Sequence, residues 1–377
     1  MNPQLPTKRR SPLVTVGHVR GVPVVVSPSW VFIGVLLTVV YGPVVRHAVT
    51  DISGSTAYLA AFGFSVVFAL CILAHELGHT VVSTALGYKV KRVVLFVLGG
   101  VSEIDGEPTR PRDELAIAAS GPFVSVIIAA AAFAGYLGVE RGSLLGVLLA
   151  LLAWSNVALA AFNLMPGLPL DGGRILRAAV WGFGASSTTA TRVAAWSGRF
   201  FAVVVAVLGV VLNSGPDTVA VSILTLFLAV YLWASATQSL KVAELISRLP
   251  LVRIPDLLRP GLLVPADLSV AEALRRVWES NARGLVVLDT ADRPSAIVDE
   301  ALIGAIPPER RPWTQVSEVA APLSPGRTVS ARVDAKALLQ HMQRHPAHEY
   351  LALDQDGAPA GIIATIDFAN QLRGARR

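Results

Sequence analysis

The sequence predicts a polytopic α-helical membrane domain of about six transmembrane helices, with a small β element at the membrane edge, followed by a soluble α/β domain. Of the 377 residues, 53% are hydrophobic and 15% are charged, whereas an average globular chain is about 25% charged. The apolar excess lies before residue 240, and charge and proline return beyond it. That second part also contains a weak internal repeat of helix and strand patterns.

Six apolar segments approach the length of about 20 residues that a transmembrane helix needs. They cover residues 30–45, 56–87, 115–139, 144–164, 199–212 and 219–236. The first segment is short, and residues 22–26 are apolar enough to extend it. The fifth has only about 15–20 residues, which is compatible with a tilted helix, a re-entrant helix or one paired with its neighbour.

Residues 88–104 follow the second segment and have a different pattern. They are rich in β-branched residues, including Val93 and Val94, and end at Gly99-Gly100. This composition favours strand over helix. The stretch is too short and too charged to cross a membrane, so we expect a small sheet or hairpin at the membrane edge.

Lysine and arginine crowd the loops on one side of the predicted spans, as the positive-inside rule requires of the cytoplasmic side. They are Lys8, Arg9, Arg10, Arg20, Lys89, Lys91, Arg92, Arg110, Arg112, Arg174, Arg177, Arg192, Lys241 and Arg248. The opposite loops hold only Arg46 and Arg141. We therefore expect a multi-pass protein of the cell membrane with both termini cytoplasmic. This distribution accounts for the net charge of +6 without a nucleic-acid partner.

Two further features limit the class of protein. Pro12, His18 and Pro23 interrupt any signal-peptide core, so we expect the N-terminal tail, residues 1–20, to be retained. The single cysteine, Cys71, lies in an apolar segment and excludes an intrachain disulfide.

The second apolar segment carries the motif His75-Glu76-Leu77-Gly78-His79. Positions four apart share one face of a helix, so His75 and His79 can both bind one metal ion, and Glu76 can act as general base. Ionisable side chains within an apolar span are costly, which favours a functional interpretation. The alternative is a buried cluster whose histidines and glutamate are satisfied by hydrogen bonds.

A catalytic zinc ion usually has three protein ligands and one open position. The other histidines lie in the N-terminal tail, in a loop on the opposite side or in the soluble part. Asp171 is the better third ligand, because it follows the fourth span at matching depth in a loop broken by Pro166 and Pro169. The alternative for Asp171 is the N-cap of a helix over residues 172–179.

The two motifs together, His75-Glu76-Leu77-Gly78-His79 and Asn163-Leu-Met-Pro166 with Leu170-Asp171-Gly172, resemble the site-2 protease family of intramembrane zinc metalloproteases, peptidase M50 type. The resemblance covers residues 20–240. It implies one zinc ion bound by His75, His79 and Asp171, with Glu76 as the base. Asn163 occupies the family's asparagine position and either steadies the scissile carbonyl or its oxyanion, or makes an interhelical hydrogen bond. Gly99-Gly100 and Ser120-Gly121-Pro122 also resemble family features, for which we favour a turn and close helix packing.

In residues 257–377 each copy of the repeat is predicted to contain a helix, a strand, a turn, a second strand and a helix. This pattern resembles a tandem CBS-domain pair. We expect copies at 257–310 and 311–377, after a membrane domain at 21–240 and a linker at 241–256. Such pairs often bind adenine nucleotides through an aspartate that matches Asp367, but Ala301 stands at that place in the first copy. Val298 and Ala364 also replace the usual threonine or serine. A degenerate, dimerising or purely structural pair is therefore the alternative.

The resemblance implies a zinc-dependent metalloendopeptidase that cleaves transmembrane segments of membrane proteins and is modulated by its CBS pair. Its implied partners are substrates with a transmembrane helix, such as anti-sigma factors, transcription regulators or signal-peptide remnants, and a second copy of the chain through the CBS pair. The alternatives are a non-catalytic protease homologue, a CBS-regulated membrane transporter, and a membrane-anchored peptidase that acts on soluble peptides.

Overall fold

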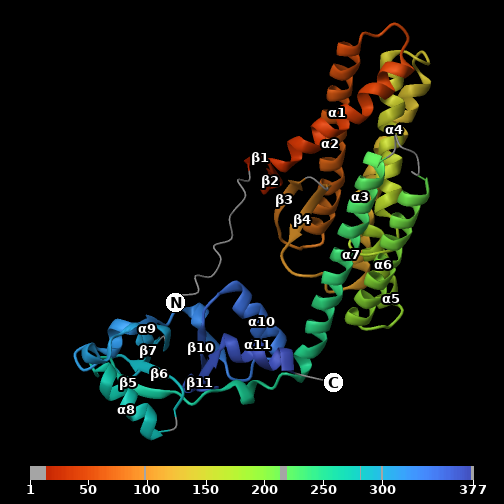
Figure 1. Cartoon of the computed structure of the whole chain (residues 1–377). Coiled ribbons are helices and arrows are strands. Elements are labelled where there is room, and N and C mark those ends of the chain that lie inside the picture. The colour runs from red at the N-terminus through yellow and green to blue at the C-terminus, as the bar shows by residue number, and fades with distance from the viewer. Residues whose placement is uncertain (1–13, 97–98, 213–218, 281, 299, 375–377) are drawn as a thin grey trace. The chain divides into compact units, whose positions relative to one another are not determined.

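The computed structural model describes residues 14–96, 99–212, 219–280, 282–298 and 300–374 (Figure 1). The chain divides into two compact units, Met1–Ala243 and Glu244–Arg377. Lys8, Arg9 and Arg10, on which the predicted topology partly depends, lie outside the described residues.

Six helices in the described part of the chain are long and apolar enough to cross a membrane, which confirms the predicted number. They are α1 Ser29–Ala48, α2 Gly54–Ala85, α3 Pro111–Leu137, α4 Leu144–Asn163, α6 Ser187–Leu212 and α7 Val219–Arg248. The fifth span is longer than predicted, because α6 has 26 residues and includes polar first turns that hydropathy alone does not mark. It is therefore long enough to cross a membrane.

The helices carry large apolar side chains on their outer faces, among them Leu59, Phe123 and Trp154, which are 70%, 65% and 72% exposed. Their contacts with one another use small residues such as Ala57, Ala61, Ala118, Ala129 and Ala160, all buried. Small residues let helix backbones approach closely, and lipid covers large outward ones. Serine residues cap several of these helices, since Ser53 accepts a hydrogen bond from Thr56 N, Ser143 from Gly146 N and Ser186 from Thr189 N.

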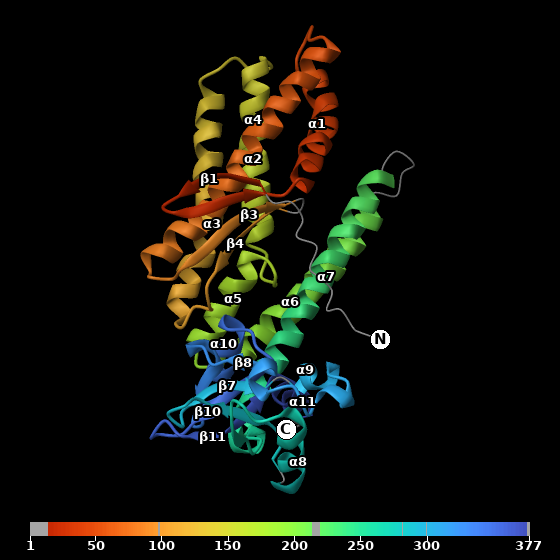
Figure 2. The ribbon, with the colours of Figure 1, turned by 90° about the vertical axis from the view of Figure 1, so that its left-hand side faces the viewer.

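A four-stranded sheet adjoins α2 and has the order β1 Val14–Val19, β2 Val22–Val26, β3 Val90–Phe96 and β4 Gly99–Ile104 (Figure 2). β2 and β3 pair in parallel, and the other two pairs are antiparallel. The expected membrane-edge β element is thus present. However, the suggestion that residues 22–26 extend the first helix is wrong, because this valine-rich stretch forms β2. Arg20 and Gly21, both with positive φ, make the turn that pairs it with β1.

A short helix, α5 Asp171–Gly182, lies between the fourth and fifth spans. Figure 1 shows α5 close to α3 and α6. The sequence predicts a loop at Asp171, whereas in the structure Asp171 is the first residue of α5, with Leu170 as the N-cap. The alternative role of Asp171 as the N-cap residue is therefore wrong.

The second unit contains two similar sets of strands and helices, as the repeat predicted. The first set comprises β5 Leu262–Pro265, α8 Val270–Ser280, β6 Leu285–Leu288, β7 Pro294–Val298, α9 Glu300–Ala305 and β8 Ala320–Pro322. The second comprises β9 Thr328–Ser330, α10 Ala335–Arg344, β10 Glu349–Leu353, β11 Pro359–Ala364 and α11 Thr365–Gly374. Short 3-10 helices cover Leu249–Leu251, Ile254–Leu257, Pro308–Arg310, Val316–Val319 and Pro325–Arg327.

The two sheets of this unit have the strand orders β5-β6-β7-β8 and β11-β10-β9. In each copy a parallel strand pair and an antiparallel hairpin stand beside two helices, which is the α/β arrangement of the expected CBS pair. Leu249, Val252 and Ile254 lie in the stretch predicted to be a linker, yet they are buried in one core with Leu338 and Tyr350. Part of that stretch therefore stabilises the second unit.

Candidate metal centre

The predicted histidine pair lies on α2, near the end of that helix. His75 and His79 are 3% and 4% exposed, and their ring centroids are 5.1 Å apart. Because the two residues are one helical turn apart, both side chains leave the same face of α2. The long apolar run before them keeps the segment helical, so the motif has the local structure that its spacing predicts.

The outer nitrogen of each imidazole has a partner on α3. His79 Nδ1 lies 2.7 Å from the main-chain oxygen of Ile117, and His75 Nδ1 lies 2.9 Å from Ser125 Oγ. A carbonyl oxygen only accepts, so His79 donates from Nδ1, and Nε2 is the nitrogen that would offer its lone pair to a metal ion. Partners of this kind fix the orientation and basicity of histidines that bind metals.

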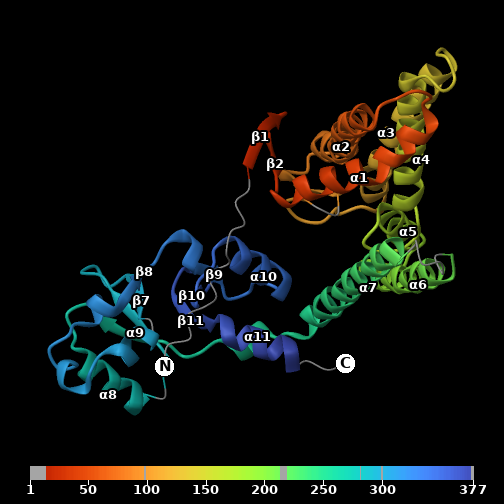
Figure 3. The ribbon, with the colours of Figure 1, turned by 45° about the horizontal axis from the view of Figure 1, so that its top comes forward.

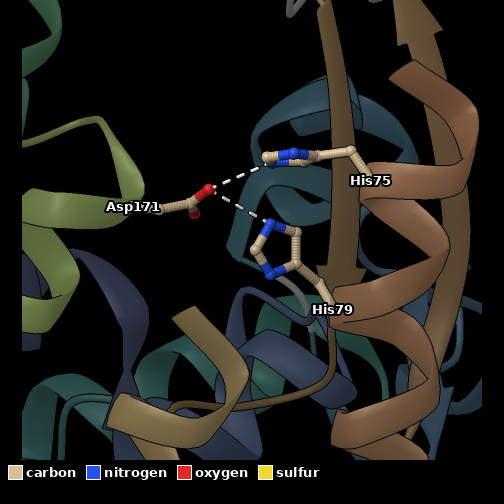
Figure 4. A group of neighbouring side chains, drawn as sticks. All are labelled: His75, His79 and Asp171. Carbon is tan, nitrogen blue, oxygen red and sulfur yellow. Dashed lines mark hydrogen bonds and ion pairs between the residues drawn. The ribbon is translucent and has the colours of Figure 1, made fainter. Parts of the chain in front are cut away.

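Asp171 reaches the same point from α5 (Figure 4). Its Oδ2 lies 3.1 Å from His75 Nε2 and 3.3 Å from His79 Nε2, and its side chain is 12% exposed. Among the described residues, these three form a group whose donor atoms all lie within 4.8 Å of one another. The structure therefore brings together the three predicted ligands from two separate helices.

The donor set fits a zinc ion. Zinc bonds of about 2.0–2.2 Å at tetrahedral angles place neighbouring donor atoms about 3.3 Å apart, close to the separations between Asp171 and the two rings. Gly121 of α3 faces the same point, since a Cβ built there would lie 2.6 Å from His75 Nε2 and would also clash with His79 Nε2. The absence of a side chain at Gly121 thus leaves the two lone pairs accessible.

Glu76 lies on α2 beside the sheet and is 8% exposed. The Ser102 hydroxyl lies 3.0 Å from the Glu76 main-chain oxygen and 3.2 Å from its Oε2. Gly100 packs on the same side chain, because a Cβ at that position would clash with Glu76 Cγ and lie 2.9 Å from Cδ. Strand β4 therefore fixes the glutamate that the sequence predicts to be the base.

The other two predicted site residues, Asn163 and Asp367, make their hydrogen bonds with residues outside this cluster. Asn163 ends α4, and its Nδ2 donates to the Leu159 carbonyl of the same helix at 3.1 Å. Asp367 belongs to the second unit, where Arg259 donates to both of its carboxylate oxygens at 2.6 and 3.0 Å. The side chain of Ala301, its counterpart in the first copy, lies outside the described residues.

A buried charge cluster ties α5 to the beginning of α3. Glu114 is 0% exposed and lies 3.2 Å from Arg177 Nη1 and 4.0 Å from Arg174 Nε. Arg177 also donates to Glu107 at 2.9 Å, in the stretch between β4 and α3. These contacts join the helix that carries Asp171 to the helix that supports both histidine rings.

Several of these supporting residues have no motif in the sequence that predicts their role. Ser125 lies four residues after Gly121, so helical spacing could have placed both on one face of α3. The Ile117 carbonyl belongs to the main chain and has no side-chain signal. Gly121 was interpreted as a close-packing residue, whereas its more specific contact is with the two imidazole nitrogens.

The fold and the site together define a membrane protein with a buried His-His-Asp cluster and an adjacent glutamate. This combination of donor atoms and neighbouring carboxylate is typical of zinc peptidases.

Comparisons with known proteins also find similarity to zinc peptidases. Residues 63–142 and 140–208 match the model of peptidase family M50. The relative named "Putative zinc metalloprotease sll0528", from Synechocystis sp., is 28% identical over 368 residues and is matched over 93% of each chain. The part of the chain that carries His75, His79 and Asp171 is thus similar to peptidase family M50, and a relative of similar length is named as a putative zinc metalloprotease.

Two solved structures are similar to separate parts of the chain. The site-2 protease from Methanocaldococcus jannaschii covers 60% of this chain and 95% of its own, with 24% identity and a TM-score of 0.42. The CBS domain of the bacterial CNNM/CorC family Mg2+ transporter covers 36% of this chain and 85% of its own, with 17% identity and a TM-score of 0.29.

Proposed function

We propose that the protein is an intramembrane zinc endopeptidase that cleaves transmembrane segments of other membrane proteins. The observation that carries this proposal is the convergence of His75, His79 and Asp171 at one buried point beneath Gly121. The three residues would hold the zinc ion through the two Nε2 atoms and one carboxylate. When bound, zinc polarises a carbonyl group and lowers the pKa of water, which is the chemistry that peptide hydrolysis needs.

In this proposal Glu76 is the general base and then the general acid. It takes a proton from the attacking water and returns it to the leaving amine. The Ser102 hydroxyl, 3.2 Å from Glu76 Oε2, and the packing of Gly100 hold the carboxylate in place. Asn163 would donate to the scissile carbonyl once its amide leaves the Leu159 carbonyl. The alternative is an interhelical hydrogen bond, whereas the bond that Asn163 makes lies within its own helix.

The substrate must present an extended backbone, because the carbonyls of an intact helix are already hydrogen-bonded. Strand β4 ends the sheet among the described strands, and its residue Gly100 lies against Glu76. An unwound substrate segment that added to this edge would be held as a further strand beside the base. This supports membrane proteins with a locally unwound transmembrane helix as the substrate class.

The positions of the basic residues support a cytoplasmic location for both termini and for the end of α2 that carries the site. Lys89 and Lys91 follow α2 directly, and Arg174 and Arg177 lie on α5, which carries Asp171. Under the positive-inside rule these segments face the cytoplasm. The histidine pair and Asp171 would then lie at the cytoplasmic end of the membrane domain.

For the CBS pair we propose a regulatory role, through nucleotide binding or dimer formation. Both carboxylate oxygens of Asp367 accept from Arg259, so a nucleotide whose ribose used Asp367 would have to displace this guanidinium. Calorimetric titration of the full chain with ATP, beside an Asp367→Asn variant, tests nucleotide binding. Sedimentation in detergent tests the dimer.

The decisive experiment reconstitutes the full chain in lipid vesicles with a model transmembrane substrate. We expect Glu76→Gln to keep one bound zinc ion and to lose cleavage, since the change removes the base and leaves the three ligands intact. A zinc-free wild-type protein that cleaves nothing would instead favour a non-catalytic homologue or a transporter. Equal cleavage of a soluble peptide and the membrane substrate would favour a membrane-anchored peptidase.

A further inference from the structure

The segment that precedes Asp171, residues 164–170, is held by helix α6. The Leu168 main-chain N–H donates to the Ala194 carbonyl of α6 at 3.0 Å. The Ser197 hydroxyl, on the same helix, donates to the Pro166 carbonyl. Leu168 is buried together with Ala194 and Ala195. Two hydrogen bonds and an apolar contact therefore fix this segment to α6.

Glycines bring the two backbones into direct contact. A Cβ at Gly198 of α6 would clash with the Leu168 carbonyl oxygen and lie 3.1 Å from the Leu168 nitrogen. A Cβ at Gly167 would lie 2.5 Å from the Gly198 Cα. Because the neighbouring atoms are backbone, they cannot rotate away as a flexible side chain could. Any side chain at Gly198 must therefore displace the segment.

The same segment packs against the first turn of α5 on its other side. A Cβ at Gly173 would clash with the Gly167 carbonyl carbon and the Leu168 nitrogen. Gly173 N donates to the Leu170 carbonyl at 3.0 Å, and Leu170 N donates to the Gly167 carbonyl at 3.0 Å. Since Asp171 follows Leu170 directly, a displacement of the segment would move the aspartate.

Helix α6 is itself fixed to α7, beside which it lies in Figures 2 and 3. The Arg199 guanidinium lies over the rings of Trp196 and Trp233, 4.8 and 5.0 Å from their centroids. It also donates to the Thr237 hydroxyl at 3.1 Å. A cation held between two aromatic rings stabilises the pair of helices, so α6 can serve as a fixed support.

We propose that Ser197 and Gly198 are positioning residues that set the Asp171 carboxylate against the two histidine rings and thereby determine zinc affinity. Among the described residues, Ser197 makes its hydrogen bond with Pro166 and Gly198 packs on Leu168, so both act on Asp171 through residues 164–170. The inference rests on the zinc centre of the proposed function. It assigns to α6, a helix that carries none of the predicted ligands, a direct part in building that centre.

The test compares two glycines of the same helix in the full-length protein. Gly198→Ala places a methyl group against the Leu168 carbonyl. Gly209→Ala also crowds a neighbour, since its Cβ would lie 2.5 Å from Thr225 Cγ2 of α7, but it lies away from residues 164–170. The measurements are the zinc dissociation constant by chelator competition, the absorption spectrum of the cobalt-substituted protein, and the unfolding temperature of the zinc-free protein.

We expect Gly198→Ala to weaken zinc binding about 10- to 100-fold, the range found when supporting residues of metal ligands are changed. The cobalt spectrum should change as well, because the carboxylate donor is displaced. Gly209→Ala should leave both unchanged while it lowers the unfolding temperature to a similar extent. Ser197→Ala should weaken zinc binding several-fold, and Ser197→Thr, which keeps the hydroxyl, should restore it.

Wild-type zinc affinity and an unchanged cobalt spectrum in Gly198→Ala would overturn the inference and leave the proposed function intact. Equal losses in Gly198→Ala and Gly209→Ala would also overturn it, since the effect would then be general helix destabilisation. If Gly198→Ala does not fold, the pair Ser197→Ala and Ser197→Thr decides in the same way. A wild-type protein that binds no zinc would refute both the proposed centre and this inference.

Discussion

The most direct test of the candidate metal centre is the substitution Gly121→Ala. The added methyl group would lie 2.6 Å from His75 Nε2 and still closer to His79 Nε2. Ordinary contact needs about 3.5 Å, so the ring of His75 would have to move away by about 0.9 Å and the ring of His79 by more. The rings are held at Nδ1 by Ser125 and by the Ile117 carbonyl, both on α3 itself.

Movement of α3 away from α2 would also lose the close packing of the two helices at Gly78. A Cβ at Gly78 would lie 3.0 Å from the Ser120 carbonyl oxygen. The methyl group at position 121 would thus occupy the space in front of both nitrogens. We expect zinc affinity to fall by at least about 100-fold, beyond the usual effect of a supporting residue, and overpacking to cost about 1–3 kcal/mol of stability.

The assay is zinc content by mass spectrometry after dialysis against buffered free zinc, with unfolding followed in parallel. Gly135→Ala is the matched control on the same helix, since its Cβ would lie 3.4 Å from Leu149 Cδ1 and fits without a clash. One tightly bound zinc ion in a folded Gly121→Ala protein would refute the view that the two Nε2 atoms bind a metal in front of Gly121.

Three further substitutions separate the roles around the centre. Ser125→Ala removes the partner of His75 Nδ1 and should weaken zinc binding about 10-fold in chelator competition; unchanged affinity would mean that the bond does not orient the ring. Gly100→Ala should displace Glu76 and lower kcat while zinc content stays at one ion per chain; a loss of zinc would place β4 among the supports of the ligands instead. Glu114→Gln leaves Arg177 without its buried counter-charge and should cost about 3–5 kcal/mol in denaturant unfolding. The double variant Glu114→Gln/Arg177→Gln should recover part of this loss, and no recovery would show that the pair is not coupled.

The membrane helices and the approach of His75, His79 and Asp171 to one another could be predicted from patterns along the sequence. Apolar runs of sufficient length indicate spans without knowledge of their neighbours. Two histidines four residues apart share a helix face in any context. Asp171 could be placed at the same depth as His75 and His79 by counting along the spans, and the structure joins all three.

The parts that sequence reasoning missed depend on contacts between distant segments. Residues 22–26 are apolar in either a helix or a strand, and only their pairing with β3, about 70 residues later, makes them β2. Hydropathy also missed the polar first turns of α6, which are helical although they are not apolar. The role of Gly121 follows from the packing of α3 on α2, which periodicity does not determine.

The two imidazoles differ in how readily mutation can alter their supports. His75 relies on a hydroxyl that a single codon change removes, so its orientation is open to tuning at position 125. His79 relies chiefly on a peptide oxygen at 2.7 Å, which every amino acid at position 117 supplies, and the Ser120 hydroxyl lies farther from it at 3.4 Å. Alanine scanning of side chains will therefore detect the contribution of Ser125 to His75. It will not detect the contribution of the Ile117 carbonyl to His79, which is lost only if the backbone of α3 moves.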